Sequence, residues 1–249
     1  MCQTYEQDPS QKPSRRDLLK NTPLGSGGAL TTVGLPKISV SEPPATPKPE
    51  NVLTPEDALT RLIQGNRRYV KGLETPDSFT TVSKALTTGQ NPYACVLGCS
   101  DSRVSPELAF DENQGDLFIT RVAGNFVTPE ILASLEYGTA VLNAQLIMVL
   151  GHTSCGAIKA AIKAIEKDED FPGHIQSLTS ALSPAVEGAI KKSPEDLADA
   201  ATRENIRLNV VKLRKATPIL SKRVRDGQLK VVGGLYEIKT GHVELIEVV

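Results

Sequence analysis

The sequence predicts an α/β domain in which a mostly parallel central sheet is flanked by helices, with an edge strand or hairpin at the C-terminus. From residue 53 onward, short apolar runs alternate with longer stretches of helical periodicity, an order typical of such sheets. The strand-like runs are almost continuously apolar, as expected of strands covered on both faces. The 249-residue chain is long enough to bury a sizeable core.

Two helix starts carry capping signals. Thr54 precedes Pro55, and Asp57 completes a pattern like a capping box, so a helix is expected to start within LTPEDALTRLIQGNRRYVKG. Its apolar residues form one stripe. In the same way Thr128 is expected to cap a helix in TPEILASLEYGTAVLN. A further helix is expected to start near Ser154.

Three apolar runs predict the first strands of the sheet, over residues 93–97, 116–122 and 145–150. After the third strand and its helix, helical sequence extends over residues 175–225. The expected interruptions and end of this helical region are at Pro184, Ser193 and Gly227.

The last segment, QLKVVGGLYEIKTGHVELIEV, predicts a strand and a hairpin that turns at Thr240 and Gly241. No internal repeat is visible, so a single domain over residues 53–249 is expected.

The N-terminal residues differ in composition from the rest of the chain. SRRDLLK, with Arg15 and Arg16, is similar to a twin-arginine export motif, and a weakly apolar, glycine-rich stretch follows it. We therefore expect an export leader over residues 1–36 and delivery to the periplasm or a thylakoid lumen. Residues 37–52 are expected to form a proline-rich linker that does not pack.

Composition excludes several classes of protein. The net charge of −1 gives no basic surface for nucleic acid or an anionic membrane. Apolar runs are too short for a stable membrane span in the mature protein. Four cysteines are too few for a disulfide framework in a chain of this size, and Cys95, inside an apolar run, is expected to be a buried small hydrophobe.

Groups that can ligate a metal follow the ends of two predicted strands. Cys99 follows the first strand, whereas His152 and Cys155 follow the third. If these strands are neighbours, the three side chains meet at the carboxyl edge of the sheet, where ligands bind in open α/β sheets. Two thiolates and one imidazole suit Zn²⁺, and three protein ligands leave the open position typical of a catalytic zinc site.

Asp101 and Arg103 follow Cys99 at alternate positions. The guanidinium can hold the carboxylate in a bidentate ion pair and keep it ionised near the metal. Each residue by itself has a plainer explanation, since a lone histidine after a strand is usually a loop residue and Asp-Ser-Arg is usually a surface turn. The joint pattern of C-x-D-x-R and G-H-x-x-C-G favours a metal site.

At these residues the chain closely resembles the β-class carbonic anhydrases. The matching motifs are, in chain order, EDALTRLIQGNRRYV, CSDSRVSPE, GDLFITRVAGN, SLEYGTAVLN, LGHTSCGA and VVGGLYEIKTGHVEL. The resemblance implies that Cys99, His152 and Cys155 bind zinc and that Asp101 and Arg103 form a catalytic dyad. Asp101 would join the ligands only in a closed form of the site.

The resemblance also implies a substrate site for CO2 and bicarbonate, made of Gln90, Phe118, Ala123, Tyr137 and Gly156, some of them reaching across a dimer interface. Gln90 would contact bicarbonate and favours the open, water-bearing form. The family further implies a homodimer or a higher even oligomer. Without the family resemblance, packing would be the simpler interpretation of Phe118, Tyr137 and Gly156. Gln90 would then be interpreted as a solvated loop residue.

The expected activity is reversible hydration of CO2 to bicarbonate and a proton by hydroxide bound to zinc. Three alternatives remain open at this point. The first is hydrolysis of CS2 or COS at the same site. The second is a catalytically idle, zinc-stabilised interaction module, which would not need Asp101, Arg103 or Gln90. The third is a redox or cysteine-nucleophile enzyme that uses Cys99, although no C-x-x-C motif or nucleophile elbow supports it.

Overall fold

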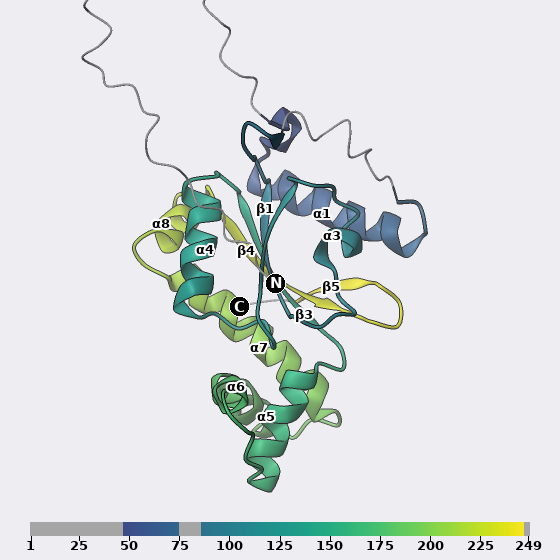
Figure 1. The fold of residues 1–249 in the computed structure, drawn as a ribbon, viewed down its shortest axis with the longest axis vertical. Helices are drawn as coiled ribbons and strands as arrows, with labels where there is room; N and C mark the ends of the chain where they lie inside the picture. Colours follow the sequence, from purple (N-terminus) through teal and green to yellow (C-terminus); the bar gives the residue numbers. More distant parts are fainter. Residues whose placement is uncertain (1–46, 75–85, 247–249) are drawn as a thin grey trace, which may run out of the picture. The chain divides into compact units, whose positions relative to one another are not determined.

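The computed structural model describes residues 47–74 and 86–246 (Figure 1). The chain divides into two units, Met1–Glu42 and Pro43–Val249, and all the described residues belong to the second. The expected export leader, residues 1–36, and most of the expected linker lie outside the described residues. Within the described ranges, no helix is long and apolar enough to cross a bilayer.

The core of the fold is a five-stranded sheet with the strand order β2-β1-β3-β4-β5. Its strands are β1 (Ala94–Gly98), β2 (Leu117–Arg121), β3 (Leu146–His152), β4 (Lys230–Tyr236) and β5 (Val243–Ile246). Strands β2, β1, β3 and β4 are parallel to one another, and only the edge strand β5 is antiparallel to its neighbour. The predicted fold class and the C-terminal hairpin are confirmed.

Helices cover both faces of the sheet (Figure 1). They are α1 (Pro55–Val70), α3 (Pro106–Ala109), α4 (Pro129–Ala140), α5 (Gly156–Lys167), α6 (Ile175–Ile190), α7 (Leu197–Lys215) and α8 (Leu220–Arg225), preceded by the short 3₁₀ helix η2 (Pro49–Asn51). Helices α1 and α3 pack on one face. Helices α4, α7 and α8 pack on the other. Helices α5 and α6 form a third apolar cluster with Cys99 and Cys155.

The two predicted caps are present. The hydroxyl of Thr54 accepts a hydrogen bond of 3.2 Å from the backbone N–H of Asp57. The hydroxyl of Thr128 accepts one of 3.3 Å from the backbone N–H of Ile131. Each cap satisfies a donor that has no partner inside its own helix, and this explains why both starts could be predicted from local sequence.

Helix α7 lies close against the sheet because glycine occupies the contact positions of the strands. A Cβ atom on Gly151 of β3 would lie 2.7 Å from Ile206 of α7, and one on Gly233 of β4 would lie 2.4 Å from the same side chain. Both distances are shorter than any real contact, so larger residues would push α7 away from the carboxyl half of the sheet.

Some boundaries differ from the expectations. Strand β3 continues through His152, so this histidine ends the strand rather than following it. Helix α6 runs through Pro184 without a break, because Leu182, Ala185 and Val186 around the proline are buried and their burial offsets a cost of about 3 kcal/mol for the proline. The helical region is interrupted around Ser193, between α6 and α7, as expected, and again between α7 and α8, where the peptide between Thr217 and Pro218 is cis.

Packing also begins earlier than Leu53, the expected start of the folded domain. The Lys48 ammonium lies 2.7 Å from Oδ1 of Asp116, and both side chains are almost fully buried. The side-chain amide of Asn51 donates to the same oxygen over 2.9 Å. These polar contacts hold the last residues of the proline-rich stretch against the domain, which its composition did not indicate.

Candidate metal centre

The candidate site lies at the carboxyl ends of two adjacent parallel strands. Strands β1 and β3 pair side by side, with Gly98 opposite Leu150. Cys99 directly follows β1, and His152 is the last residue of β3. Cys155 is the N-cap residue of α5. The condition on which the predicted cluster depended, that the first and third strands are neighbours, is therefore met.

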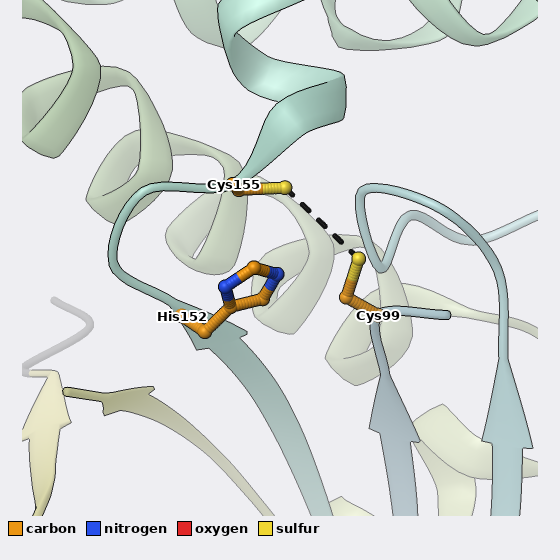
Figure 2. Close-up of side chains that lie close together, drawn as sticks. All are labelled: Cys99, His152 and Cys155. Atoms are coloured by element: carbon orange, nitrogen blue, oxygen red, sulfur yellow. Dashed lines mark hydrogen bonds between the residues drawn. The ribbon is translucent and has the colours of Figure 1, made fainter. Parts of the chain in front are cut away.

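The three side chains converge on one point (Figure 2). The sulfur atoms of Cys99 and Cys155 are 4.0 Å apart. One ligand atom from each of Cys99, His152 and Cys155 lies within 4.8 Å of the others, and all three residues are buried. They come from two strand ends and one helix start, so the fold alone brings them together.

The imidazole of His152 has one nitrogen engaged and one without a partner. Nδ1 lies 3.0 Å from the carbonyl oxygen of Thr153, which favours the tautomer that carries its proton there. Nε2 is buried and finds no hydrogen-bond partner among the residues that the structure describes. A buried polar nitrogen without a partner is costly, and a nitrogen held this way is typical of a metal-ligating histidine.

The donor set fits a tetrahedral zinc ion. Two Zn–S bonds of about 2.3 Å at a tetrahedral angle place their sulfur atoms about 3.8 Å apart, close to the observed separation of 4.0 Å. Cys95, Cys99 and Cys155 are all free thiols. The unpartnered Nε2 of His152 completes two soft sulfur ligands and one imidazole, a combination that zinc prefers.

The loop after β2 contributes a backbone donor to this cluster. The N–H of Gly124 donates to Sγ of Cys99 over 3.3 Å. Gly124 has a φ of +86°, and a Cβ atom there would lie 2.8 Å from a methyl carbon of Leu182. Glycine is therefore required both by the backbone conformation and by the close packing.

The two thiols share one proton in the metal-free protein. The pKa of Cys99 is lowered to about 4, first because the thiol of Cys155 donates to it, and further because the backbone N–H groups of Gly124 and Asp101 donate, while burial opposes the shift. The pKa of Cys155 is raised for the complementary reason, since losing its proton would remove that hydrogen bond and place two buried thiolates side by side. Ionisation is therefore favoured at Cys99 over Cys155.

Asp101 and Arg103 form the expected bidentate ion pair at the edge of the cluster. The guanidinium donates to Oδ1 of Asp101 over 2.9 Å and to Oδ2 over 2.7 Å, and it also reaches the carbonyl oxygen of Ser154 at 3.3 Å. Oδ2 lies 3.8 Å from Nε2 of His152. Arg103 holds the pKa of Asp101 well below its usual range, so the carboxylate is ionised at neutral pH.

Two of the five expected substrate-binding residues lie beside the cluster. Ala123 immediately precedes Gly124, whose N–H reaches Cys99. Gly156 is the first residue of α5 and follows Cys155. Space is open around Gly156, since nothing lies within 4 Å of the point where a Cβ atom would be.

The other three substrate-binding candidates do not lie beside the cluster within one chain. Phe118 pairs in register with Cys95, four residues or about 13 Å along the strand from Cys99. Its ring centroid is 6.1 Å from that of Tyr137, so these two aromatic residues form a separate group. Gln90 is exposed and precedes the amino end of β1, whereas Cys99 follows its carboxyl end.

Arg121 is a residue of this site that no sequence motif indicated. Its guanidinium donates to the carbonyl oxygens of Cys99, Asp101 and Val104, each over 2.8 Å. It fixes the backbone of the loop that carries Cys99, Asp101 and Arg103. The available signal was a charged residue at the end of the second strand, but the sequence does not reveal that this strand lies next to β1.

Comparison with known proteins points to one family. The family model described as carbonic anhydrase matches residues 94–243. Carbonic anhydrase 2 of Mycobacterium tuberculosis is 34% identical over 192 residues, which cover 77% of this chain and 92% of that protein. A carbonic anhydrase of Synechococcus elongatus is 30% identical over 194 residues, which cover 74% of this chain and 70% of that protein.

Solved structures show the same likeness. The β-carbonic anhydrase CcaA superposes with a TM-score of 0.60 and 30% identity, over 76% of this chain and 95% of that chain. The Coccomyxa β-carbonic anhydrase superposes with a TM-score of 0.58 and 28% identity, over 76% of this chain and 86% of that chain.

Proposed function

Because this chain belongs to the β-class carbonic anhydrases, we propose that Cys99, His152 and Cys155 hold one Zn²⁺ ion and that the enzyme hydrates CO2 reversibly to bicarbonate and a proton. The observation that carries this proposal is the convergence of three buried ligand atoms within 4.8 Å, one of them a nitrogen without a protein partner. A structural zinc site would use a fourth protein ligand, whereas three ligands leave one position for a solvent molecule.

When bound, zinc supplies a Lewis acid that lowers the pKa of a coordinated water molecule to about 7. The protein's own contribution begins with the orientation of the ligands. The carbonyl oxygen of Thr153 holds His152 through Nδ1, so that Nε2 would be the nitrogen that binds the metal. The Gly124 N–H fixes the sulfur of Cys99 from the side of the loop after β2.

Asp101 is proposed to orient the attacking water by accepting its proton in a hydrogen bond. Oδ2 of Asp101 lies near the ligand cluster, 3.8 Å from Nε2 of His152. Arg103 engages both carboxylate oxygens, which keeps Asp101 charged and supports a role as hydrogen-bond acceptor rather than as a fourth ligand. This corresponds to the open form of the site, in which Asp101 does not bind the metal.

The substrate pocket is proposed to be completed by a second copy of the chain. Gln90, Phe118 and Tyr137 lie away from the metal cluster of their own chain, and the Tyr137 side chain is 47% exposed, so it can reach a neighbouring subunit. A homodimer, or a higher even oligomer built from dimers, would place these residues opposite the cluster of the partner subunit. Ala123 and Gly156 would line the same pocket from the chain that holds the metal.

The test is CO2 hydration by the purified full-length protein, measured together with its zinc content. We expect about one zinc per chain, loss of activity with a chelator, and recovery when zinc is added back. Protein that holds one zinc per chain but does not hydrate CO2 would contradict the proposal. Parallel assays with CS2 and COS as substrates separate hydration from the hydrolysis of those compounds.

Export by a twin-arginine route is a second part of the proposal, supported by SRRDLLK and the weakly apolar stretch that follows it. Such routes carry folded proteins, so zinc could be loaded before the protein crosses the membrane. Replacing Arg15 and Arg16 with lysine in a fusion to a reporter protein should retain the reporter in the cytoplasm. Unchanged export of the double variant would contradict this assignment.

A further inference from the structure

One face of α7 is polar and contacts the loop that touches the metal cluster. Asn205, Asn209 and Lys212 are spaced so that they share a face of this helix. The Asn205 and Asn209 side chains are only 2% and 6% exposed. Most of the remaining inward residues of α7 are apolar and pack against the sheet, so the polar row requires a separate explanation.

The row binds the backbone of residues 124–127. The side-chain amide of Asn205 donates to the carbonyl oxygen of Gly124 over 2.8 Å. The side-chain oxygen of Asn209 accepts from the N–H of Val127 over 2.8 Å. The ammonium of Lys212 donates to the carbonyl oxygen of Val127 over 2.8 Å. Three side chains from one helix therefore fix both ends of a four-residue segment.

The orientation of the Asn205 amide is itself fixed. Nδ2 of Asn209 donates to the side-chain oxygen of Asn205 over 2.9 Å and to its backbone carbonyl over 2.8 Å. The oxygen of Asn205 thus accepts from Asn209, and its nitrogen is left to donate to Gly124. Buried amides with satisfied donors and acceptors hold a single orientation.

Gly124 connects this row to the metal ligand. Its carbonyl oxygen is held by Asn205, and its N–H donates to Sγ of Cys99 over 3.3 Å. Leu182 packs on the other side of Gly124, where an added Cβ atom would lie 2.8 Å from its methyl carbon. Holding the carbonyl in place restrains the φ and ψ angles of Gly124, and through them the peptide plane that carries its N–H.

We propose that Asn205 is a positioning residue for Cys99, which it reaches through Gly124 without contacting the metal. By holding Gly124, it directs a backbone N–H at the thiolate, stabilises the ionised sulfur and keeps the loop in the conformation that binds metal. This proposal rests on the proposed function, because it requires Cys99 to be a ligand. Groups that orient metal ligands typically contribute about 10–100-fold to metal affinity.

The test compares full-length variants in two measurements other than activity. The first is zinc affinity, determined by competition with a chelator. The second is the sulfur-to-metal charge-transfer band of the cobalt(II)-loaded protein. Asn205→Leu, which has a similar volume, should lower zinc affinity by about 10–100-fold. It should also shift the band to longer wavelength, because a thiolate that has lost a hydrogen bond holds its electrons less tightly.

Asn66→Leu is the matched control. Asn66 is also a buried asparagine with three hydrogen bonds, to Ala109, Gly241 and Val243. It lies on α1, and none of these three partners belongs to the metal cluster or to the 124–127 segment. This variant should lose thermal stability while its zinc affinity and cobalt band stay at the wild-type values. Equal changes in both variants would overturn the proposal, since a general loss of stability would then explain them.

If Asn205→Leu does not fold, Asn209→Leu tests the same positioning role of Asn205. It leaves Asn205 in place but frees its amide, so a smaller shift in the same direction is expected. Wild-type affinity and an unshifted band in the folded variant would overturn the proposal. A wild-type protein that binds neither zinc nor cobalt would instead refute the assignment of Cys99 as a ligand, and with it the proposed function.

Discussion

The sulfur atoms of Cys99 and Cys155 lie 4.0 Å apart, although 56 residues separate them in the chain. A disulfide would bring them to about 2.05 Å, whereas a shared tetrahedral zinc ion would place them about 3.8 Å apart. The distance is imposed by the pairing of β1 with β3 and by the start of α5. The protein therefore holds two unbridged cysteine sulfur atoms at the spacing that a metal requires.

Replacing Cys99 with serine should remove the metal. The hydroxyl is a poor zinc ligand at neutral pH, and the two remaining ligands bind far more weakly than three. Zinc content by elemental analysis should fall from about one per chain to near zero, and CO2 hydration should be lost with it. A variant that keeps both zinc and activity would remove Cys99 from the site.

Cys95→Ala is the control for this experiment. Cys95 is also buried, and burial raises the pKa of its thiol to about 12, but it faces the apolar core. The change should cost about 1 kcal/mol of stability through the small cavity that it leaves. Zinc content and activity should stay at the wild-type level.

Asp101→Asn should separate metal binding from turnover. The variant keeps the three ligands, so its zinc content should stay near one per chain. The amide cannot accept the water proton as the carboxylate does, and turnover should fall by about 10²–10⁴-fold, the range typical of a lost proton acceptor. The measurement is kcat for CO2 hydration at constant zinc occupancy. Asp199→Asn, which loses an ion pair on α7, is the charge-matched control, and equal losses in the two variants would argue against a specific role for Asp101.

The metal-free protein should contain one thiolate at the site across neutral pH. Because the pKa of Cys99 is lowered to about 4 and that of Cys155 is raised, the thiolate is present above about pH 4 and is lost as the pH falls through that value. Ultraviolet thiolate absorbance, taken as the difference between wild type and Cys99→Ser, should show this midpoint. A midpoint near the ordinary thiol value of about 8.5 would mean that the two thiols do not share a proton. Since Cys155 must lose its proton to become a ligand, zinc affinity should also weaken as the pH is lowered.

A shared pocket between subunits predicts complementation. Gln90→Ala and Cys99→Ser homo-oligomers should each be inactive or nearly so. In a mixed oligomer, one site combines an intact metal cluster with an intact Gln90 from the other subunit. Mixing the variants after dissociation and reassociation should therefore restore about one quarter of wild-type activity, when random dimers form and each intact site acts alone. Activity that stays at the level of the separate variants would place Gln90 and the cluster in the same subunit, or Gln90 outside the pocket.

The N-cap of α1 offers a test of the fold rather than of the site. Thr54→Ala removes the hydroxyl that accepts from Asp57, and it should destabilise the protein by about 1 kcal/mol. That loss corresponds to a lower Tm by about 2–4 °C for a domain of this size. Thr60→Ala, at an exposed position inside the same helix, should leave Tm unchanged or raise it slightly. Scanning calorimetry of the two variants measures the difference.

Local patterns explain why much of the fold could be predicted. The start of α1 at Pro55 and that of α4 at Pro129 are determined by neighbouring residues, because a cap is a contact between residues three positions apart. The buried strands were visible as apolar runs. Pro184 shows where this reasoning fails, since its local cost is offset by burial against other helices, which the sequence around it does not reveal.

The candidate site was also predictable only in part. The types of residue at Cys99, His152 and Cys155 gave the donor chemistry, but their meeting depended on which strands are neighbours. The resemblance supplied Gln90, Phe118 and Tyr137, and the structure places them away from the metal cluster of their own chain. Arg121 and Asn205 were not predicted, because their roles consist of contacts with backbone atoms of distant loops.

The sequence by itself determined the elements, their order and the set of metal-binding side chains, since caps, apolar runs and ligand types are properties of adjacent residues. Only the tertiary structure decided that β1 lies beside β3, that Asn205 reaches Gly124, and that the aromatic pair lies outside its own chain's metal site. The physical reason is that these relationships join residues far apart in the chain. Contacts of that kind depend on strand order and helix packing, which no local pattern encodes.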